Sequence, residues 1–122
     1  MSNTPDRRAV WERYVTSWKV ESVTEKRALF ESCLSRACTY SDPLQVAEGW
    51  DALLAYMAEL QKQIPGAHFV TEYFATHHQK SMAKWLMLNA DAVRIAEGTS
   101  FGEYDAHGFL LAMTGFFETA AS

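Results

Sequence analysis

Several features that mark whole classes of protein are missing from this sequence. No apolar run approaches the roughly 18 to 20 residues of a membrane span. The polar residues 1–6 lead into an amphipathic pattern rather than the apolar core of a signal peptide. Lysine and arginine number 11 against 15 aspartate and glutamate residues, and they form no basic block of the kind that nucleic acid binding requires. We therefore expect a cytoplasmic protein that contacts neither a membrane nor nucleic acid.

Residues that commonly hold metals, phosphates or disulfides are also few. Cys33 and Cys38 are five positions apart, which permits a disulfide but favours two buried thiols. His77 and His78 are consecutive in an expected strand, where neighbouring side chains point to opposite faces and cannot share one ion. The sequence has no glycine-rich phosphate loop. We expect no metal and no cofactor.

What the chain does contain is enough apolar material for one core and many aromatic rings. With 122 residues, of which 48% are hydrophobic, it is long enough for one domain spanning residues 1–122. Four Trp, five Tyr and seven Phe residues make up 13% of the chain. Such side chains fill a core or line a cavity for a small apolar or aromatic ligand, and composition leaves both alternatives open.

The first half of the sequence predicts three amphipathic helices, because apolar residues recur there at spacings of three and four. Ser22 and Glu25 form a capping-box pattern that opens the second helix, with Thr24 as an alternative cap. Pro65 stops the third helix. The predicted helices are Pro5–Val20, capped by Thr4, then Ser22 to near Ser35, and Gly49–Ile64.

The remaining segments are rich in Phe, Val, Thr, Tyr and Trp and broken by short turns, which predicts strands. The first strand, Ala37–Ser41, lies between the second and third helices, and Leu44–Glu48 is expected to be a connection. Further strands are predicted at Ala67–His78, Met82–Asn89, Val93–Tyr104 and Phe109–Glu118. Three helices and one strand followed by a four-strand meander imply an α+β fold, in which one curved sheet wraps the helices.

Asp42 is the first candidate for a functional residue. It directly follows the first strand, and Pro43 after it holds it in an extended conformation. The two-residue period of a strand places it on the same face as Tyr40. An ionisable group at a strand end suits an active site, whereas an Asp-Pro pair is also common in turns. On these residues alone both interpretations stay open.

Local strings over nearly the whole chain are similar to those of one superfamily. They are Arg13-Tyr14-Val15, Tyr40-Ser41-Asp42-Pro43, Gly49-Trp50-Asp51-Ala52-Leu53, Ile64-Pro65-Gly66, Glu97-Gly98-Thr99-Ser100-Phe101 and Thr114-Gly115-Phe116-Phe117. In order and spacing they resemble the nuclear transport factor 2-like superfamily, which includes ketosteroid isomerases and SnoaL-like polyketide cyclases. The resemblance implies a cone-shaped α+β barrel, with a curved mixed sheet wrapped around three N-terminal helices. It also implies a homodimer formed through the convex face of the sheet.

The same resemblance implies roles for individual residues. In the isomerases the aspartate at the position of Asp42 is the general base, and the tyrosine at the position of Tyr14 donates a hydrogen bond to the developing enolate. The family's second oxyanion donor, a protonated aspartate, corresponds to Ser100. Its third-helix tyrosine corresponds to Met57, with Tyr56 one residue earlier.

Aromatic side chains supply the expected walls of a binding site. If Gln79-Lys80 is a two-residue turn, Phe74 and Trp85 pair on one face of the sheet. The expected substrate-binding residues are Trp18, Tyr40, Tyr56, Met57, Phe74, Trp85, Ser100, Phe101 and Phe117. Together with the catalytic candidates, they suggest a SnoaL-like or isomerase-like enzyme that acts by proton transfer on a small, mostly apolar carbonyl compound. The alternative is a non-catalytic ligand-binding or dimerisation module of the same fold.

Overall fold

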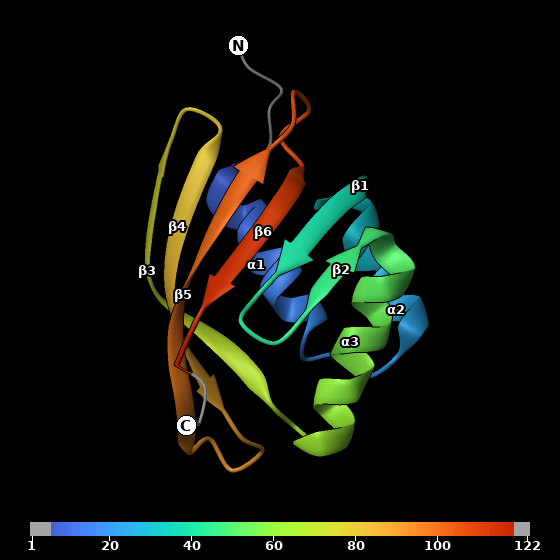
Figure 1. Ribbon diagram of the computed structural model, residues 1–122, viewed down its shortest axis with the longest axis vertical. Coiled ribbons are helices and arrows are strands. Elements are labelled where there is room, and N and C mark those ends of the chain that lie inside the picture. Colours follow the sequence, from blue (N-terminus) through green and yellow to red (C-terminus); the bar gives the residue numbers. More distant parts are fainter. Residues whose placement is uncertain (1–5, 119–122) are drawn as a thin grey trace.

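The computed structural model describes residues 6–118, so that Thr4 and Pro5, the expected start of the first helix, lie outside it. Within this range the chain has the predicted α+β organisation, with helices on the concave side of a curved sheet (Figure 1). The helices are α1 (Arg7–Ser17), α2 (Val23–Glu31) and α3 (Gly49–Gln63). The strands are β1 (Leu34–Ser41), β2 (Val46–Glu48), β3 (His68–His77), β4 (Lys80–Leu88), β5 (Arg94–Tyr104) and β6 (Leu110–Phe116).

All six strands belong to one mixed sheet in the order β2-β1-β6-β5-β4-β3. β1 pairs with β6 in parallel, and the other neighbouring pairs are antiparallel. The expected curved mixed sheet around three helices is therefore confirmed. Because β2 and β3 lie at the two ends of the strand order, the sheet is open rather than a closed barrel. The segment Leu44–Glu48, expected to be a connection, contains the short strand β2, which pairs with β1.

Local capping explains where α1 and α2 begin, and strand pairing explains where α2 ends. The Asp6 side chain caps α1, which starts later than predicted. Ser22 caps α2 as predicted. That helix ends at Glu31, before the expected Ser35, because Leu34 already pairs with β6 as the first residue of β1.

The β3–β4 hairpin turns one residue earlier than predicted. His77 pairs with Lys80, which leaves His78 in the turn with a positive φ of 52°. Phe74 consequently pairs with Ala83 rather than with the predicted tryptophan. The left-handed backbone also brings the Nδ1 atoms of the two histidines within 3.1 Å, so their rings do not point to opposite faces as expected. Among residues 6–118, no group of three or more His, Cys, Asp or Glu side chains is arranged to hold a metal ion.

The core between the helices and the sheet includes one buried charge. Lys26 is 2% exposed, and its Nζ donates hydrogen bonds to the carbonyl oxygens of Ser17, at 2.7 Å, and Val20. Carbonyl groups at the end of a helix have no partner within the helix. Lys26 therefore holds the segment that follows α1 and carries Trp18. Burial lowers the pKa of Lys26, and the nearby Glu21 opposes this effect.

The two cysteines are buried free thiols, as predicted. Cys33 lies between α2 and β1, and Cys38 lies on β1. Burial raises the pKa of Cys33 to about 12 and that of Cys38 to about 11. Both groups are therefore uncharged near neutral pH, which makes them poor nucleophiles.

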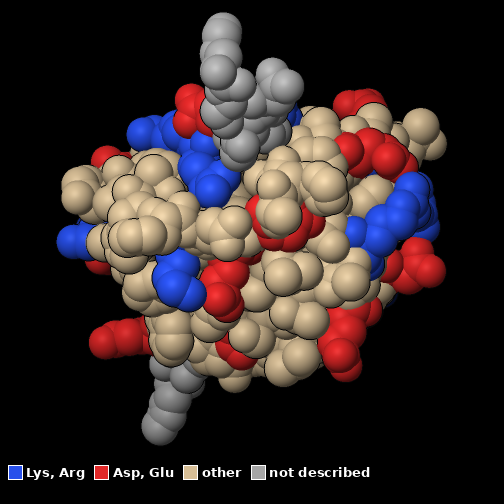
Figure 2. Space-filling model, turned by 90° about the horizontal axis from the view of Figure 1, so that it is seen from above, with Lys and Arg blue, Asp and Glu red and all other residues tan. Residues whose placement is uncertain are grey.

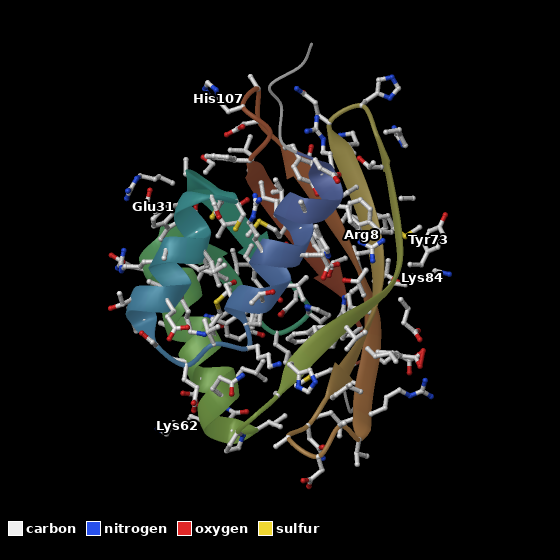
Figure 3. All side chains as sticks on the ribbon, turned by 180° about the vertical axis from the view of Figure 1, so that it is seen from behind. Arg8, Glu31, Lys62, Tyr73, Lys84 and His107 are labelled. Carbon is white, nitrogen blue, oxygen red and sulfur yellow. The ribbon has the colours of Figure 1, made fainter. Side chains whose placement is uncertain are left out.

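The convex face of the sheet carries exposed apolar side chains. Phe101 on β5 and Phe116 on β6 are 46% and 56% exposed, and their ring centroids lie 5.9 Å apart. Tyr73 and Lys84 point outward from β3 and β4 (Figure 3). This face therefore combines an aromatic pair with scattered polar groups.

Charged side chains of both signs are interspersed with uncharged ones on the face seen in Figure 2. The formal net charge of the whole chain is −4. Within the range that the structure describes, none of the helices is both long and apolar enough to cross a membrane.

Candidate functional site: an aromatic cavity around Asp42

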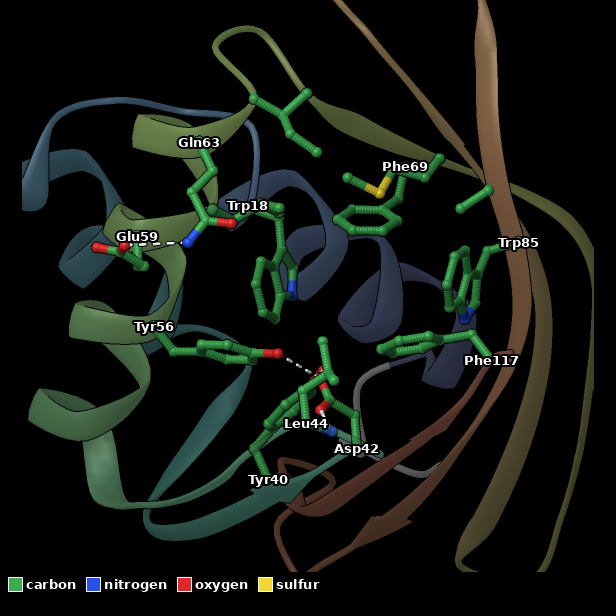
Figure 4. Close-up of a pocket in the computed structure, with 14 residues that line it drawn as sticks. Trp18, Tyr40, Asp42, Leu44, Tyr56, Glu59, Gln63, Phe69, Trp85 and Phe117 are labelled. Carbon is green, nitrogen blue, oxygen red and sulfur yellow. Dashed lines mark hydrogen bonds between the residues drawn. The ribbon is translucent and has the colours of Figure 1, made fainter. Parts of the chain in front are cut away.

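A cavity of about 420 Å³ lies between α3 and the concave face of the sheet (Figure 4). Its volume is within the range of small-molecule sites, which is roughly 300 to 1,000 Å³. One wall comes from α3, and the opposite wall from β3, β4, β5 and the residue after β6. The lining residues are Trp18, Tyr40, Asp42, Leu44, Tyr56, Glu59, Leu60, Gln63, Ile64, Phe69, Trp85, Met87, Ala96 and Phe117.

Asp42 is the central polar group of this cavity, and four donors hold its carboxylate. Oδ1 accepts hydrogen bonds from the backbone N–H groups of Leu44, at 2.8 Å, and Gln45, at 3.0 Å. Oδ2 accepts from the hydroxyl groups of Tyr40, at 2.5 Å, and Tyr56, at 2.8 Å. A carboxylate offers about four acceptor positions, so this one is fully used. The turn that sequence reasoning weighed against a functional role is present, and it orients the side chain toward the cavity.

The two tyrosines remain protonated donors at ordinary pH. Burial raises the pKa of Tyr40, and the neighbouring Tyr14 and the hydrogen bond to Asp42 raise it further. Burial also raises the pKa of Tyr56, followed by the effect of its own hydrogen bond to Asp42. Because a phenol with a raised pKa keeps its proton, both hydroxyl groups can donate either to Asp42 or to a ligand oxygen.

Aromatic rings form a continuous wall around the carboxylate. The ring centroid of Trp18 lies 5.6 Å from that of Tyr40, 5.8 Å from that of Tyr56 and 5.7 Å from that of Phe69. Phe69 in turn lies 5.2 Å from Trp85. The centroids of Trp85 and Phe117 are 6.1 Å apart and complete the wall. Trp18 therefore packs against rings on both sides of the cavity, Tyr56 on α3 and Phe69 on β3.

Gly98 allows Trp85 to lie against the sheet. A Cβ atom at position 98 would lie 2.4 Å from an atom of the Trp85 ring and 2.6 Å from the carbonyl oxygen of Phe116. Such distances are far shorter than a normal van der Waals contact. The volume of the cavity therefore depends on the missing side chain at this position.

Tyr14 and Ser100 lie in a second, much smaller cavity of about 40 Å³, which shares Trp18, Tyr40, Phe69 and Trp85 with the large one. The Trp85 indole donates a hydrogen bond to the Ser100 Oγ at 2.9 Å. Tyr14 is 4% exposed, and burial raises its pKa. Within the described residues, no hydrogen bond joins Tyr14 to Asp42. Tyr14 and Asp42, to which the resemblance gives the catalytic roles, therefore line two adjoining cavities.

The other predicted site residues divide into three groups. Trp18, Tyr40, Tyr56, Trp85 and Phe117 line the large cavity together with Asp42. Met57 is fully buried in the core, and Phe74 packs against that core, so neither lines the cavity. Phe101 lies on the convex face, because it directly follows the inward-facing Ser100 and successive strand residues point to opposite faces.

Sequence reasoning missed the residues that complete the cavity, among them Leu44, Glu59, Gln63, Phe69 and Met87. Once Tyr56 is placed, the spacing of three and four along α3 indicates Glu59 and Gln63. Phe69 gave no comparable signal. Strict alternation places Phe69 and Phe74 on opposite faces, because they are five positions apart, and only the irregularity between Thr71 and Tyr73 brings both to the inner face.

Comparison with known proteins identifies the fold. No family model matches the sequence, and no curated protein matches it. Solved structures do match, and one of them is a nuclear transport factor 2-like protein of unknown function from Cytophaga hutchinsonii. That structure is 11% identical with a TM-score of 0.71, and the match covers 97% of this chain and 95% of that chain. This chain therefore has the nuclear transport factor 2-like fold.

Two further structures carry names that suggest a chemistry. A candidate isomerase of the SnoaL-like family from Agrobacterium tumefaciens is 22% identical with a TM-score of 0.84, covering 93% of this chain and 97% of that chain. A candidate ketosteroid isomerase from Kribbella flavida is 17% identical with a TM-score of 0.71, covering 100% of this chain and 84% of that chain. At these identities the likeness establishes the fold alone.

Proposed function

We propose that this protein is a small enzyme that transfers a proton within a small, mostly apolar carbonyl compound, with Asp42 as the general base. The observation that carries the proposal is the pair of hydrogen bonds from Tyr40 and Tyr56 to one carboxylate oxygen inside an aromatic cavity. The apolar walls suit an apolar substrate, and the carboxylate suits abstraction of a proton next to a carbonyl. The names of the similar structures, which include a candidate isomerase and a candidate polyketide cyclase, support the same class of chemistry.

In the mechanism that we propose, Tyr56 has two successive partners. In the free protein its hydroxyl donates to Asp42. When a substrate carbonyl enters, rotation about the Cζ–O bond moves this hydrogen bond to the carbonyl oxygen. The movement frees a lone pair on Oδ2 and places a donor where negative charge will develop. We therefore assign to Tyr56 the donor role that the resemblance gave to Tyr14.

The proton transfer then proceeds in two balanced steps. Asp42 takes a proton from the carbon next to the carbonyl, and the electrons of the broken C–H bond form the C=C bond of an enolate. The enolate oxygen accepts the hydrogen bond from Tyr56, which keeps its own proton because its pKa is raised. Return of the proton from Asp42 to another carbon gives isomerisation. Return to the same carbon, after the carboxyl proton has exchanged with solvent, gives exchange of the α-proton.

The proposal can be tested although the natural substrate is unknown. NMR measures the exchange of α-protons for deuterium in a panel of small ketones and enones. We expect the wild-type protein to accelerate exchange and Asp42→Asn to abolish it. Tyr56→Phe should reduce the rate by about 100-fold, the usual effect of losing one oxyanion donor. Tyr73→Phe, which alters an exposed tyrosine on the convex face, is the matched control. Exchange that persists in Asp42→Asn would contradict the assignment.

One observation favours a second candidate function, a ligand-binding module without catalysis. All four acceptor positions of Asp42 are occupied, so a ligand that does not displace Tyr56 finds no free lone pair on the carboxylate. This alternative predicts ligands that bind in the cavity and exchange no protons.

We also propose that the protein forms a homodimer through the convex face of its sheet. Support comes from the exposed aromatic pair Phe101 and Phe116, whose ring centroids lie 5.9 Å apart, and Leu111 on β6 is also 41% exposed. Contiguous exposed apolar surface commonly marks an interface.

A further inference from the structure

The cavity wall carries negative charge and no positive charge. Asp42 lies at the end of β1 and Glu59 on α3, and both are among the lining residues. All of the lining residues are described by the structure, and none of them is lysine, arginine or histidine. An anionic ligand would be repelled by two carboxylates and would find no positive charge in the wall. The cost of placing an anion there rises as water is excluded. The charge of the wall therefore selects against anions.

The polar groups of the wall mostly offer acceptors rather than donors. Tyr40 and Tyr56 give their hydroxyl hydrogens to Asp42. The Gln63 amide nitrogen donates to the Glu59 carboxylate at 3.0 Å, as Figure 4 shows at the α3 side of the cavity. Apart from the Tyr56 hydroxyl, which can turn to a substrate carbonyl, and the second N–H of the Gln63 amide, mainly oxygen lone pairs remain for a ligand. A ligand that matches these groups must supply its own donors or a positive charge.

The aromatic wall favours the same kind of ligand. The faces of Trp, Tyr and Phe rings are electron-rich and attract organic cations, most strongly where water is excluded. Six rings line this cavity, including the Trp18 ring that joins its two sides. Two of the six rings also donate to a carboxylate, which increases the electron density on the ring.

We infer that the ligand of this cavity is a small organic cation, with a substituted ammonium nitrogen on a mostly apolar frame. The aromatic rings and the two carboxylates would bind the charge, and the apolar side chains of the wall would bind the frame. The inference rests on the proposed function, because it takes the ligand of this cavity to be the carbonyl substrate and assigns that substrate a positive charge. It also adds a reason for the chemistry, since a positive charge in the substrate stabilises the enolate that develops beside it.

A pair of ligands with one shape and different charge tests this inference by calorimetry. Phenyltrimethylammonium and tert-butylbenzene differ in a single atom, nitrogen against carbon, and so in charge. We expect the cation to bind at least about tenfold more tightly, as one cation–aromatic contact in a dry site implies. Both Asp42→Asn and Glu59→Gln should reduce this preference severalfold.

Glu97→Gln is the matched control, because Glu97 follows the cavity residue Ala96 and points to the opposite face of the sheet. It removes the same charge from the chain but should leave the preference unchanged. Equal binding of the two ligands would overturn the inference. It would not affect the proton-transfer proposal, which the deuterium exchange assay tests separately. A preference reduced equally by all three variants would also overturn it, because the net charge of the protein would then be the cause. Binding of neither ligand would overturn it as well.

Discussion

Replacing Lys26 with methionine tests how the segment that carries Trp18 is held against the cavity. Methionine keeps most of the length of the lysine stem but removes the Nζ donor. The carbonyl oxygens of Ser17 and Val20 then lose the hydrogen bonds that Lys26 gives them. Because these carbonyls lie where α1 has ended, no helical N–H replaces the lost donor.

The size of the effect is a balance of two terms. Two carbonyl groups without partners cost about 1 to 3 kcal/mol each, or about 4 kcal/mol together. The variant no longer buries the charge of Lys26, and the avoided desolvation cost offsets about 2 kcal/mol of this loss. The net loss is about 2 kcal/mol, and an unfolding entropy of about 2.1 cal/mol/K per residue converts it to a fall in Tm of about 8 °C for a chain of this length. The stability of the wild-type protein relative to the variant should grow as pH rises from the lowered pKa of Lys26 in the folded state toward 10.5, its value in the unfolded chain. Within this range only the unfolded chain still binds the proton, so rising pH favours the folded state.

Differential scanning calorimetry measures this change, and Lys19→Met is the control. Lys19 is exposed on the same segment, so its replacement should change stability by less than about 0.5 kcal/mol. The fluorescence of Trp18 should also shift in the Lys26 variant if the segment moves. An unchanged or raised Tm in Lys26→Met would refute the reasoning, because the cost of burying the charge would then exceed the value of the two hydrogen bonds.

Further predictions concern the cavity, the thiols and the convex face. Gly98→Ala should cost about 2 kcal/mol or more, because the new methyl group overlaps the sheet and the cavity wall, and urea unfolding measures this. Cys33 and Cys38 should resist iodoacetamide in the native protein and react once it is unfolded, as followed by mass spectrometry. Since both thiols have raised pKa values in the folded state, stability should fall as pH rises above about 9, where only the unfolded chain ionises. The double variant Phe101→Lys with Phe116→Lys should halve the mass measured by light scattering, and an unchanged mass would exclude the convex face as the interface.

The alternation of apolar residues predicted most of the fold, because the helical and strand periods are local properties of the chain. The helix α3, for example, was found to within one residue of its end. The strand β2 was missed because three residues are too few to show a period. The hairpin turn was misplaced by one residue, since nothing in the sequence indicated that His78 would adopt a positive φ.

The candidate site was predicted in part, and the limits have a common cause. Asp42 directly follows β1, two positions after Tyr40, so their meeting on one face follows from local geometry. Which α3 residue faces them depends on the rotation of the helix against the sheet, and the structure selects Tyr56 over Met57. Tyr14 and Asp42 line two different cavities, which share Trp18, Tyr40, Phe69 and Trp85 as walls, and this division depends on how those rings pack. Rotation and packing are tertiary properties that a single sequence does not determine.

The parallel pairing of β1 with β6 has a consequence for the order of events in folding. Tyr40 pairs with Met113 and Ser41 with Thr114, so strands more than 70 positions apart meet directly beside Asp42. Contacts this distant in sequence form late, because a long loop must close first. The cavity is therefore incomplete until β6 is in place, and no earlier species can gain from ligand binding. A ligand should accordingly slow the unfolding of this protein and leave its rate of folding unchanged.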